Sequence, residues 1–362
     1  MAVALGCALP APVDVPAPSI ALRDQGRARA HALGIHIGAL PAGVHDAITD
    51  VPGVAVGHAT LHEGERLHTG VTVILPHGPG SNPFRDRCNA AVVVQNGFGK
   101  LIGSTQVNEL GELEAPIALC GTLNVFRVAD GLLDWLLTLP GNEDVRSANV
   151  VVGETNDGRL SDIRSRPLGS EHVRAAIAAA TTGEVPVGAV GAGAGTVAFG
   201  WKGGIGTASR VVDGHTVGVL VQSNFGGRLV IAGVPVHEQL RPEDHGAADR
   251  DGSCMIVIAT DAPLDAAALR RLAARAFAGM ARCGASFSNG SGDYAIAFST
   301  AARDATWRRG DALSPLFVAV ADATEQAIVD SLCAAQTTTG MGRTVPALPL
   351  QPLREVLASR AR

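Results

Sequence analysis

Residues 241–264 read RPEDHGAADRDGSCMIVIATDAPL and join three kinds of local structure. A charged, turn-rich loop ends at Gly252, and the apolar run from Cys254 to Ala259 is typical of a strand covered on both faces. Asp261 and Pro263 then predict the start of a helix. Five Gly-Ser pairs occur in the chain, but only at Gly252 does an acidic loop lead into a predicted buried strand. We therefore expect the chemistry at this junction.

Cleavage of the Gly252–Ser253 bond would make Ser253 an amino-terminal residue, with its hydroxyl beside its own α-amine. An α-amino group has a reference pKa of about 7.7–8.0, so near neutral pH an appreciable fraction of it accepts a hydroxyl proton. This arrangement indicates a self-processing enzyme with an amino-terminal nucleophile. The alternative interpretation is an ordinary junction between a loop and a strand.

Composition excludes several classes of protein. The 362 residues are 46% hydrophobic, which is enough to form the core of one large or two modest domains. The net charge is -5 and no basic stripe is present, so we expect no nucleic-acid partner. The longest apolar runs are interrupted before the roughly 18 residues that span a bilayer, so we expect no membrane partner. Six scattered cysteines predict free thiols in a reducing compartment.

The amino-terminal segment is Pro-rich and lacks a positively charged start. We interpret residues 1–20 as a disordered leader, followed by one domain over residues 21–362. A truncated export signal is the alternative, so a cytoplasmic location is expected and a periplasmic one stays open.

Predicted strands occur in runs and predicted helices in pairs, without an internal repeat. This order favours an α+β protein in which sheets pack face to face with helices outside. We expect a helix over residues 125–138 with Phe126 on its buried face, and another over residues 264–282. The run LFVAVA at 316–321 predicts a strand, and Asp322 is expected to begin the helix after it.

Two motifs could suggest a cofactor, but neither has the required context. The glycine-rich stretch at 191–210 lacks the helix that follows the glycines in a dinucleotide site, so strands and tight turns are expected there. His58 and His62 are four residues apart but do not match a zinc-protease helix, and we interpret them as structural. We therefore expect no metal and no cofactor, with nucleotide binding as an alternative of a different class.

Eleven ordered motifs extend along nearly the whole chain. They are HDAITDVPGVAVGH (45–58), HTGVTVILP (68–76), NPFRD (82–86), NGFGK (96–100), NELGELEAPIAL (108–119), TLN (122–124), ETNDG (154–158), GAGAGTVAFGWKGGIGTASR (191–210), VQSNFG (221–226), IATDAPL (258–264) and SNGSGD (288–293). Together with the DGS step at 251–253, they resemble the L-aminopeptidase/D-esterase and β-peptidyl aminopeptidase family of N-terminal nucleophile hydrolases. The resemblance implies a four-layered αββα sandwich that is cut between Gly252 and Ser253. The resulting chains, 1–252 and 253–362, would stay together in homo-oligomers.

The resemblance also implies roles for individual residues. Ser253 matches the nucleophile of both self-cleavage and catalysis, and Asn224 in VQSNFG matches a donor to the oxyanion. Ser291 and Asp293 match residues that hydrogen-bond the nucleophile and its amine. The best-matched relatives in the family carry Glu where this chain has Asp293, so the shorter side chain is a departure at that contact.

Two further positions concern the substrate. Glu154 in ETNDG matches a carboxylate near the substrate's amino group, and Asn156 is the choice of the β-peptidases where other members have Tyr. The resemblance therefore implies a serine aminopeptidase that releases β-amino acids such as β-alanine from short peptides and amides. Hydrolysis of D-alanyl or L-aminoacyl amides and esters, or of ω-amino-acid oligomers, is the alternative within the group. An unprocessed protein without activity is the alternative outside it.

Overall fold

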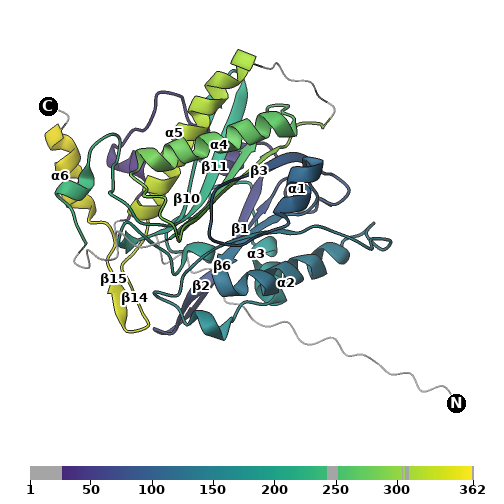
Figure 1. Cartoon of the computed structure of the whole chain (residues 1–362), viewed down its shortest axis with the longest axis horizontal. Helices are drawn as coiled ribbons and strands as arrows, with labels where there is room; N and C mark the ends of the chain where they lie inside the picture. Colours follow the sequence, from purple (N-terminus) through teal and green to yellow (C-terminus); the bar gives the residue numbers. More distant parts are fainter. Residues whose placement is uncertain (1–26, 243–251, 304, 306–309, 361–362) are drawn as a thin grey trace.

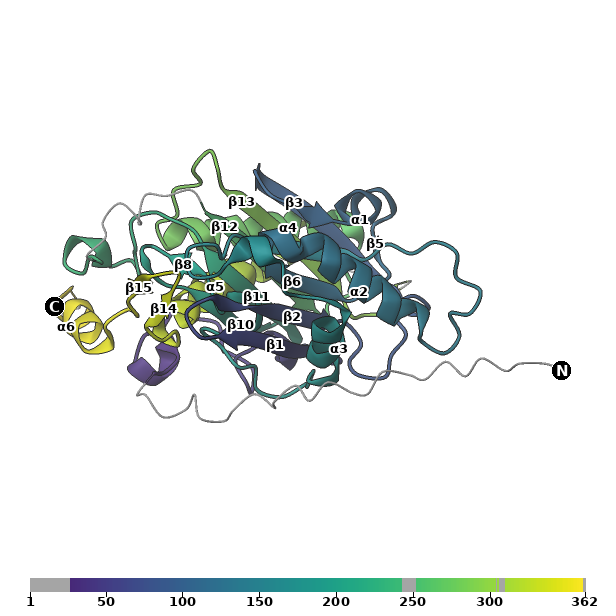
Figure 2. The same cartoon turned by 90° about the horizontal axis from the view of Figure 1, so that it is seen from below.

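The computed structural model describes residues 27–242, 252–303, 305 and 310–360 of the chain. The predicted leader at 1–20 lies outside these residues, as does most of the charged loop before Gly252. The described residues form two main sheets, with helices on the outer face of each (Figures 1 and 2).

The first sheet has five strands in the order β1-β2-β6-β7-β4. Their bounds are Ala55–Glu63 (β1), Leu67–Leu75 (β2), Ile117–Gly121 (β6), Val151–Thr155 (β7) and Leu101–Ile102 (β4). The second sheet has six strands in the order β10-β11-β12-β13-β3-β5. Their bounds are Gly204–Val212 (β10), His215–Asn224 (β11), Ser253–Thr260 (β12), Gly292–Ser299 (β13), Cys88–Gly97 (β3) and Glu112–Leu113 (β5). The pairs β6–β7 and β12–β13 are parallel and the other pairs in these two sheets are antiparallel.

Six α-helices and two small hairpins complete the described structure. The helices are Ser104–Leu110 (α1), Val125–Leu137 (α2), Ser170–Ala178 (α3), Ala266–Arg282 (α4), Ser314–Cys333 (α5) and Leu350–Arg360 (α6). The hairpins pair Val197–Ala198 (β8) with Trp201–Lys202 (β9), and Thr338–Gly340 (β14) with Arg343–Val345 (β15).

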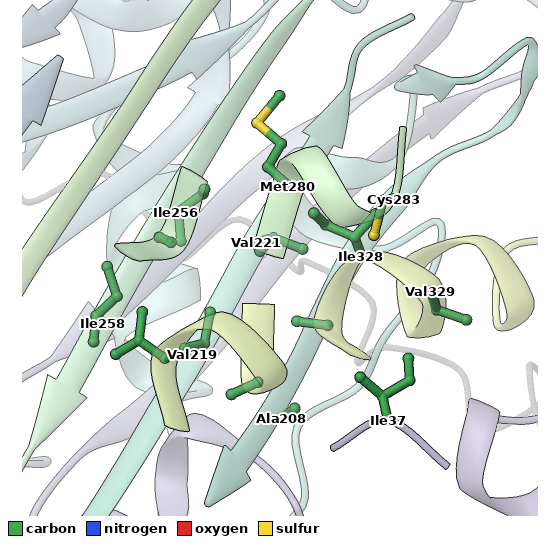
Figure 3. Packing of buried hydrophobic residues seen from close by; sticks show 14 of the residues in the cluster. Ile37, Ala208, Val219, Val221, Ile256, Ile258, Met280, Cys283, Ile328 and Val329 are labelled. Carbon is green, nitrogen blue, oxygen red and sulfur yellow. The ribbon is translucent and has the colours of Figure 1, made fainter. Parts of the chain in front are cut away.

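Strand β12 shows how the alternation of side chains builds the layers. Ile256 and Ile258 point towards α4 and α5, where they join the cluster drawn in Figure 3. Met255 and Val257 point the other way and pack between the two sheets. Because successive side chains leave opposite faces of a strand, one apolar run fills two cores. Complete burial of one such side chain contributes about 1.5–3 kcal/mol.

A third core lies between the five-stranded sheet and helices α2 and α3. The layers are therefore α2 and α3, the five-stranded sheet, the six-stranded sheet, and α4 and α5 (Figure 2). This arrangement confirms the predicted αββα sandwich.

Helix α5 corrects two predictions. The run at 316–321 is helical, and Asp322 lies inside the helix that begins at Ser314 with Pro315 in its first turn. Sixteen residues of α5 are buried because it packs on β10, β11 and α4, so the apolar run alone could not distinguish a buried strand from a buried helix.

The segment Gly310–Cys333 is long and apolar enough to cross a membrane by length and composition alone. However, 72% of its most apolar window is buried inside the molecule. This burial is what a core helix of a layered protein shows.

The helix faces were predicted with mixed success. Leu269, Leu272 and Met280 of α4 are buried as expected. The predicted face of α2 was wrong at Phe126, which is 62% exposed, because the buried stripe follows Val125, Val128 and Leu132. The five cysteines in the described part of the chain are free, as predicted, and all five are buried.

Candidate active site

Three adjacent strands of the six-stranded sheet bring the proposed nucleophile and its neighbours into one row. Asn224 ends β11, Ser253 begins β12 and Gly292 begins β13, and these residues pair across the sheet in that order. Directly paired residues have their side chains on the same face, so Asn224 and Ser253 face the same layer. Both are nearly buried, with 7% and 6% of their surface exposed. The nucleophile and the oxyanion donor predicted from the sequence therefore lie together.

Gly252, on the amino side of Ser253, occupies a position where only glycine fits. A Cβ atom there would lie 2.2 Å from the carbonyl oxygen of Asn224 and 2.4 Å from the Cα of Phe225. The carbonyl oxygen of Gly252 accepts a hydrogen bond of 3.0 Å from the Gly292 amide. The carbonyl carbon that Ser253 would attack is thus held in place, and its oxygen is polarised by a backbone N–H.

The amide orientation of Asn224 is set by the hairpin β8–β9. The Val197 N–H donates to Asn224 Oδ1 at 2.9 Å. Since the amide oxygen is engaged by this donor, the Nδ2 group is the end that is left to donate elsewhere. Asn224 and Val197 both line a cavity of about 610 Å³, so this donor lies at the edge of a space that could hold a substrate.

Ser291 and Asp293 form a buried pair at the start of β13. The Ser291 hydroxyl donates to Asp293 Oδ1 at 2.9 Å, and both residues are at most 1% exposed. The other carboxylate oxygen, Oδ2, has no hydrogen-bond partner within the described residues. Burial raises the pKa of Asp293 to about 6, against the stabilising hydrogen bonds from Ser291 and the Cys254 backbone.

Glu154 reaches the same region from the end of β7. Its side chain is 3% exposed, and Oε1 accepts a hydrogen bond of 2.9 Å from the Lys100 backbone and an ion pair of 3.1 Å from Lys100 Nζ. Oε1 also borders Gly99, where a Cβ would lie 3.2 Å from it and 3.2 Å from the Tyr294 hydroxyl oxygen. Gly99 borders Gly292 in turn, because a Cβ at Gly292 would lie 3.3 Å from the Gly99 Cα. The Glu154 carboxylate, which is suited to bind an ammonium ion, is thus separated only by Gly99 from Gly292, the residue that pairs with Ser253.

Lys202 and Asp157 are buried charged residues that the sequence analysis did not single out. Lys202 Nζ donates to the carbonyl oxygens of Gly193, Thr196 and Gly203 at 2.8–2.9 Å. Burial lowers the pKa of Lys202 to about 7 and raises that of Asp157 to about 6, and each charge partly offsets the shift of the other. Lys202 therefore fixes the loop that carries Val197, which in turn orients Asn224.

The sequence does contain a signal for Lys202, because the chain has only two lysines, Lys100 and Lys202. Both lie at this site. All other cationic side chains except histidines are arginines.

The cavity brings together residues from several parts of the chain. It is lined by Asn156, Gly158, Arg159, Ile163, Val197, Asn224, Phe225, Gly226, Met341 and Arg343. Of the predicted site residues, Asn156 and Asn224 line it directly, and Ser253 adjoins it through its pairing with Asn224. Glu154, Ser291 and Asp293 are not among the lining residues.

The two histidines have protein partners in the first sheet. His58 Nδ1 lies 2.9 Å from the Thr72 hydroxyl, and His62 Nδ1 lies 3.0 Å from His68 Nδ1. Within the described ranges no group of three or more His, Cys, Asp or Glu side chains could hold a metal ion.

Comparison with known proteins identifies the family of this chain. The profile of Peptidase family S58 matches residues 46–345, so the chain belongs to that family. It is thus a hydrolase of the aminopeptidase class, and the family resemblance found in the sequence is confirmed.

Individual relatives define the similarity further. The chain is 41% identical over 370 residues to the beta-peptidyl aminopeptidase BapA of Sphingosinicella microcystinivorans, with 91% of each chain covered. A beta-aminopeptidase from Burkholderia sp. superposes with a TM-score of 0.84 at 40% identity, over 92% of this chain and 99% of the other.

The third comparison bears on the fold. The L-aminopeptidase D-Ala-esterase/amidase of Ochrobactrum anthropi, described as a variant of the Ntn hydrolase fold, has a TM-score of 0.84 at 34% identity. It covers 92% of this chain and 99% of its own. The predicted N-terminal nucleophile hydrolase fold is thereby confirmed.

Proposed function

We propose that this enzyme cuts its own chain between Gly252 and Ser253. It then uses Ser253 to release amino-terminal residues, preferentially β-amino acids, from short peptides and amides. The observation that carries the proposal is the pairing of Ser253 with Asn224 on one side and Gly292 on the other. Ser253 also follows Gly252, a position that has no room for a side chain.

Self-cleavage would begin with attack of Ser253 Oγ on the Gly252 carbonyl carbon. The oxygen of that carbonyl already accepts a hydrogen bond from the Gly292 amide, which stabilises the negative charge that develops on it. The Ser253 nitrogen leaves with a proton, which gives an ester between Gly252 and the serine hydroxyl. Water then hydrolyses the ester, leaving a carboxylate on Gly252 and a free α-amine on Ser253.

Turnover would use that amine as the general base. It accepts the Ser253 hydroxyl proton while Oγ attacks the substrate carbonyl, and Asn224 Nδ2 donates to the oxyanion. The leaving amine takes the proton, and water hydrolyses the aminoacyl ester to free the amino acid. Ser291 and Asp293 would hold the amine and hydroxyl in position, and the contact that supports this role is the hydrogen bond from the Cys254 backbone, one residue after Ser253, to the Asp293 carboxylate.

Glu154 would restrict the enzyme to free amino termini by pairing with the substrate ammonium group. The preference for β-amino acids is supported by the similarity to a beta-peptidyl aminopeptidase and by Asn156 in the cavity lining. The similarity to an L-aminopeptidase D-Ala-esterase/amidase favours the second candidate, D-alanyl or L-aminoacyl amides and esters. Assembly into homo-oligomers stays a prediction from the sequence resemblance.

Intact mass of the purified protein, followed by kinetics on β-alanyl, L-alanyl and D-alanyl p-nitroanilides, tests the proposal. We expect two chains, 1–252 and 253–362, and the highest kcat/KM on the β-alanyl substrate. A single uncut chain that nevertheless hydrolyses amides would contradict the mechanism, and a strong preference for an α-aminoacyl substrate would reverse the substrate assignment.

A further inference from the structure

Two arginines line the cavity beside the proposed oxyanion donor. Arg159 follows the turn after β7, and Arg343 begins β15 in the carboxyl-terminal hairpin. No acidic side chain is among the residues that line this cavity in the described part of the chain. The cavity wall therefore carries two positively charged side chains beside the neutral amides of Asn156 and Asn224.

The elements that carry the arginines are packed against each other. A Cβ at Gly340, in the strand before Arg343, would lie 2.2 Å from the Leu160 carbonyl oxygen, so the hairpin touches the segment that holds Arg159. The hairpin turn is also tied to the first sheet, because the Met341 amide donates to the Glu65 carbonyl oxygen at 2.8 Å. These backbone contacts hold the two elements together, so both arginines lie at one cavity.

Arg343 is available to a ligand. Its side chain is exposed, and no carboxylate within the described ranges lies at ion-pair distance from it. Guanidinium groups bind carboxylates through paired, charge-assisted hydrogen bonds, so an anion is the ligand that this wall fits best.

The position of the carboxylate relative to the scissile bond indicates where such an anion would lie. In a dipeptide the free carboxylate is two bonds from the scissile nitrogen, whereas in a longer peptide it lies further along the chain. With the scissile oxygen at Asn224 and the ammonium group towards Glu154, the carboxylate of a dipeptide would fall on the leaving-group side of the same cavity.

We propose, on the basis of the proposed function, that Arg159 and Arg343 form a subsite for the carboxylate of the leaving amino acid. The enzyme would then favour dipeptides with a free carboxyl terminus over the same dipeptides with a carboxamide terminus. The subsite acts on specificity and takes no part in bond making.

The test measures kcat/KM for β-alanyl-L-alanine and for β-alanyl-L-alaninamide. We expect the wild type to favour the free acid by about tenfold or more, which corresponds to one charge-assisted hydrogen bond. Arg159→Gln and Arg343→Gln should each lower this ratio by about tenfold. The ratio does not depend on the active fraction of the sample, so partial misfolding of a variant does not affect it.

Arg146→Gln is the matched control. This exposed arginine donates only to carbonyl oxygens of its own turn, and its removal changes the net charge equally. The ratio should be unchanged in this variant. Equal rates on acid and amide in the wild type, or an unchanged ratio in both cavity variants, would overturn the subsite.

A second substrate pair, L-alanyl-L-alanine and its amide, separates the subsite from the acyl preference. An enzyme that prefers the L-alanyl pair but still favours the acid contradicts only the β-amino-acid assignment. If neither pair is hydrolysed, calorimetric affinities for β-alanyl-L-alanine and its amide give the same ratio, with the same expected loss in the two cavity variants.

Discussion

Glu154 and Asp293 are both buried carboxylates at the candidate active site, but they differ in their partners. Glu154 already pairs with a cation of its own chain, Lys100 Nζ at 3.1 Å. Asp293 has the Ser291 hydroxyl and a backbone amide, and its Oδ2 atom has no partner within the described residues. One carboxylate is compensated in the uncut chain, and the other lacks a cation.

This difference has a simple physical meaning. A buried carboxylate without a cation is costly, so burial raises the pKa of Asp293 to about 6. Cleavage before Ser253 would create an ammonium group at the start of the neighbouring strand, where it could compensate Asp293. Glu154, in contrast, would have to exchange Lys100 for the ammonium group of a substrate.

The largest effect is expected where cleavage is blocked, because the ammonium group that would compensate Asp293 is then never formed. Ser253→Ala removes the attacking hydroxyl, so we expect one uncut, folded chain without amidase activity. A denaturing gel, intact mass and an amide assay measure this outcome. Ser299→Ala, at the other end of the same sheet, is the control and should cut normally. Normal cutting of the Ser253 variant would sink the mechanism.

The next effect concerns the proposed oxyanion donor, Asn224, which pairs with Ser253 across the sheet. Removal of one such donor costs about 100-fold to 1,000-fold in turnover, or roughly 2.7–4 kcal/mol. We expect this loss in kcat for processed Asn224→Ala, and little change for Asn89→Ala at the far end of β3. A change below about threefold in the Asn224 variant would reject the assignment.

Glu154→Gln tests whether this carboxylate selects free amino termini. Truncation of one partner of a buried charge pair costs roughly 2–5 kcal/mol, so the wild type should cut a free-amine substrate far better than its N-acetyl form. The variant should lose most of this preference, while the exposed Glu109→Gln keeps it. Equal cutting of both substrates by the wild type, or full preference in the variant, would show that Glu154 is not the anchor.

A pH profile tests the state of Asp293 before cutting. In the uncut chain no α-amine is available, so we assign the base of self-cleavage to the Asp293 carboxylate on the adjacent strand, whose pKa is raised by burial to about 6. We expect the rate of self-cleavage to fall about tenfold per pH unit below that value. Turnover by the cut enzyme needs the neutral α-amine, whose reference pKa is about 7.7–8.0, so its acid limb should lie at a higher pH than that of self-cleavage.

The raised pKa of Asp293 also determines how the stability of the uncut chain changes with pH. The folded uncut chain holds the Asp293 proton more tightly than the unfolded chain, whose carboxyl has a pKa of about 3.9. The contribution of this group to the free energy of unfolding is therefore full at low pH and declines as pH rises from about 4 to 6.

Pulsed synthesis followed by gels at several pH values measures the rate of self-cleavage, and amide assays at the same pH values measure turnover. Coincident acid limbs for cutting and turnover would contradict separate bases.

The smallest effect is expected at Lys100. Its side chain is 41% exposed, and pairs of this kind contribute roughly 0.2–1 kcal/mol after screening by solvent. Lys100→Met should therefore lower KM for a free-amine substrate by no more than about fivefold, because the substrate no longer competes with the lysine. A higher KM would mean that Lys100 supports the substrate site and does not compete for it.

The sequence predicted most of the fold because alternating apolar residues are a local signal. Strand β12 and the buried face of α4 are visible from spacing alone. The first turns of α5 resemble a strand in the sequence because the run at 316–321 is continuously apolar, and burial of sixteen of the twenty residues of the helix removes the period that an exposed face would leave.

The site was predictable only in part. Ser253, Asn224 and Asp293 were found through motifs that resemble a family, and their placement in one region follows from strand pairing, which a single sequence does not encode locally. Arg159 and Arg343 carry no signal of their own, because they lie far apart in the chain and meet only when the carboxyl-terminal hairpin packs beside the segment after β7.

The chain has only two lysines, and this has a practical consequence for chemical labelling. The amines of the protein are the ε-amines of Lys100 and Lys202 and the α-amine of each chain. Lys202 is fully buried and donates to three carbonyl oxygens, so an amine-reactive reagent does not reach it in the folded protein. Self-cleavage would add one reactive amine at the nucleophile itself, and substrate would protect that amine. The mass added by one reagent under native conditions would thus report both maturation and occupancy of the site.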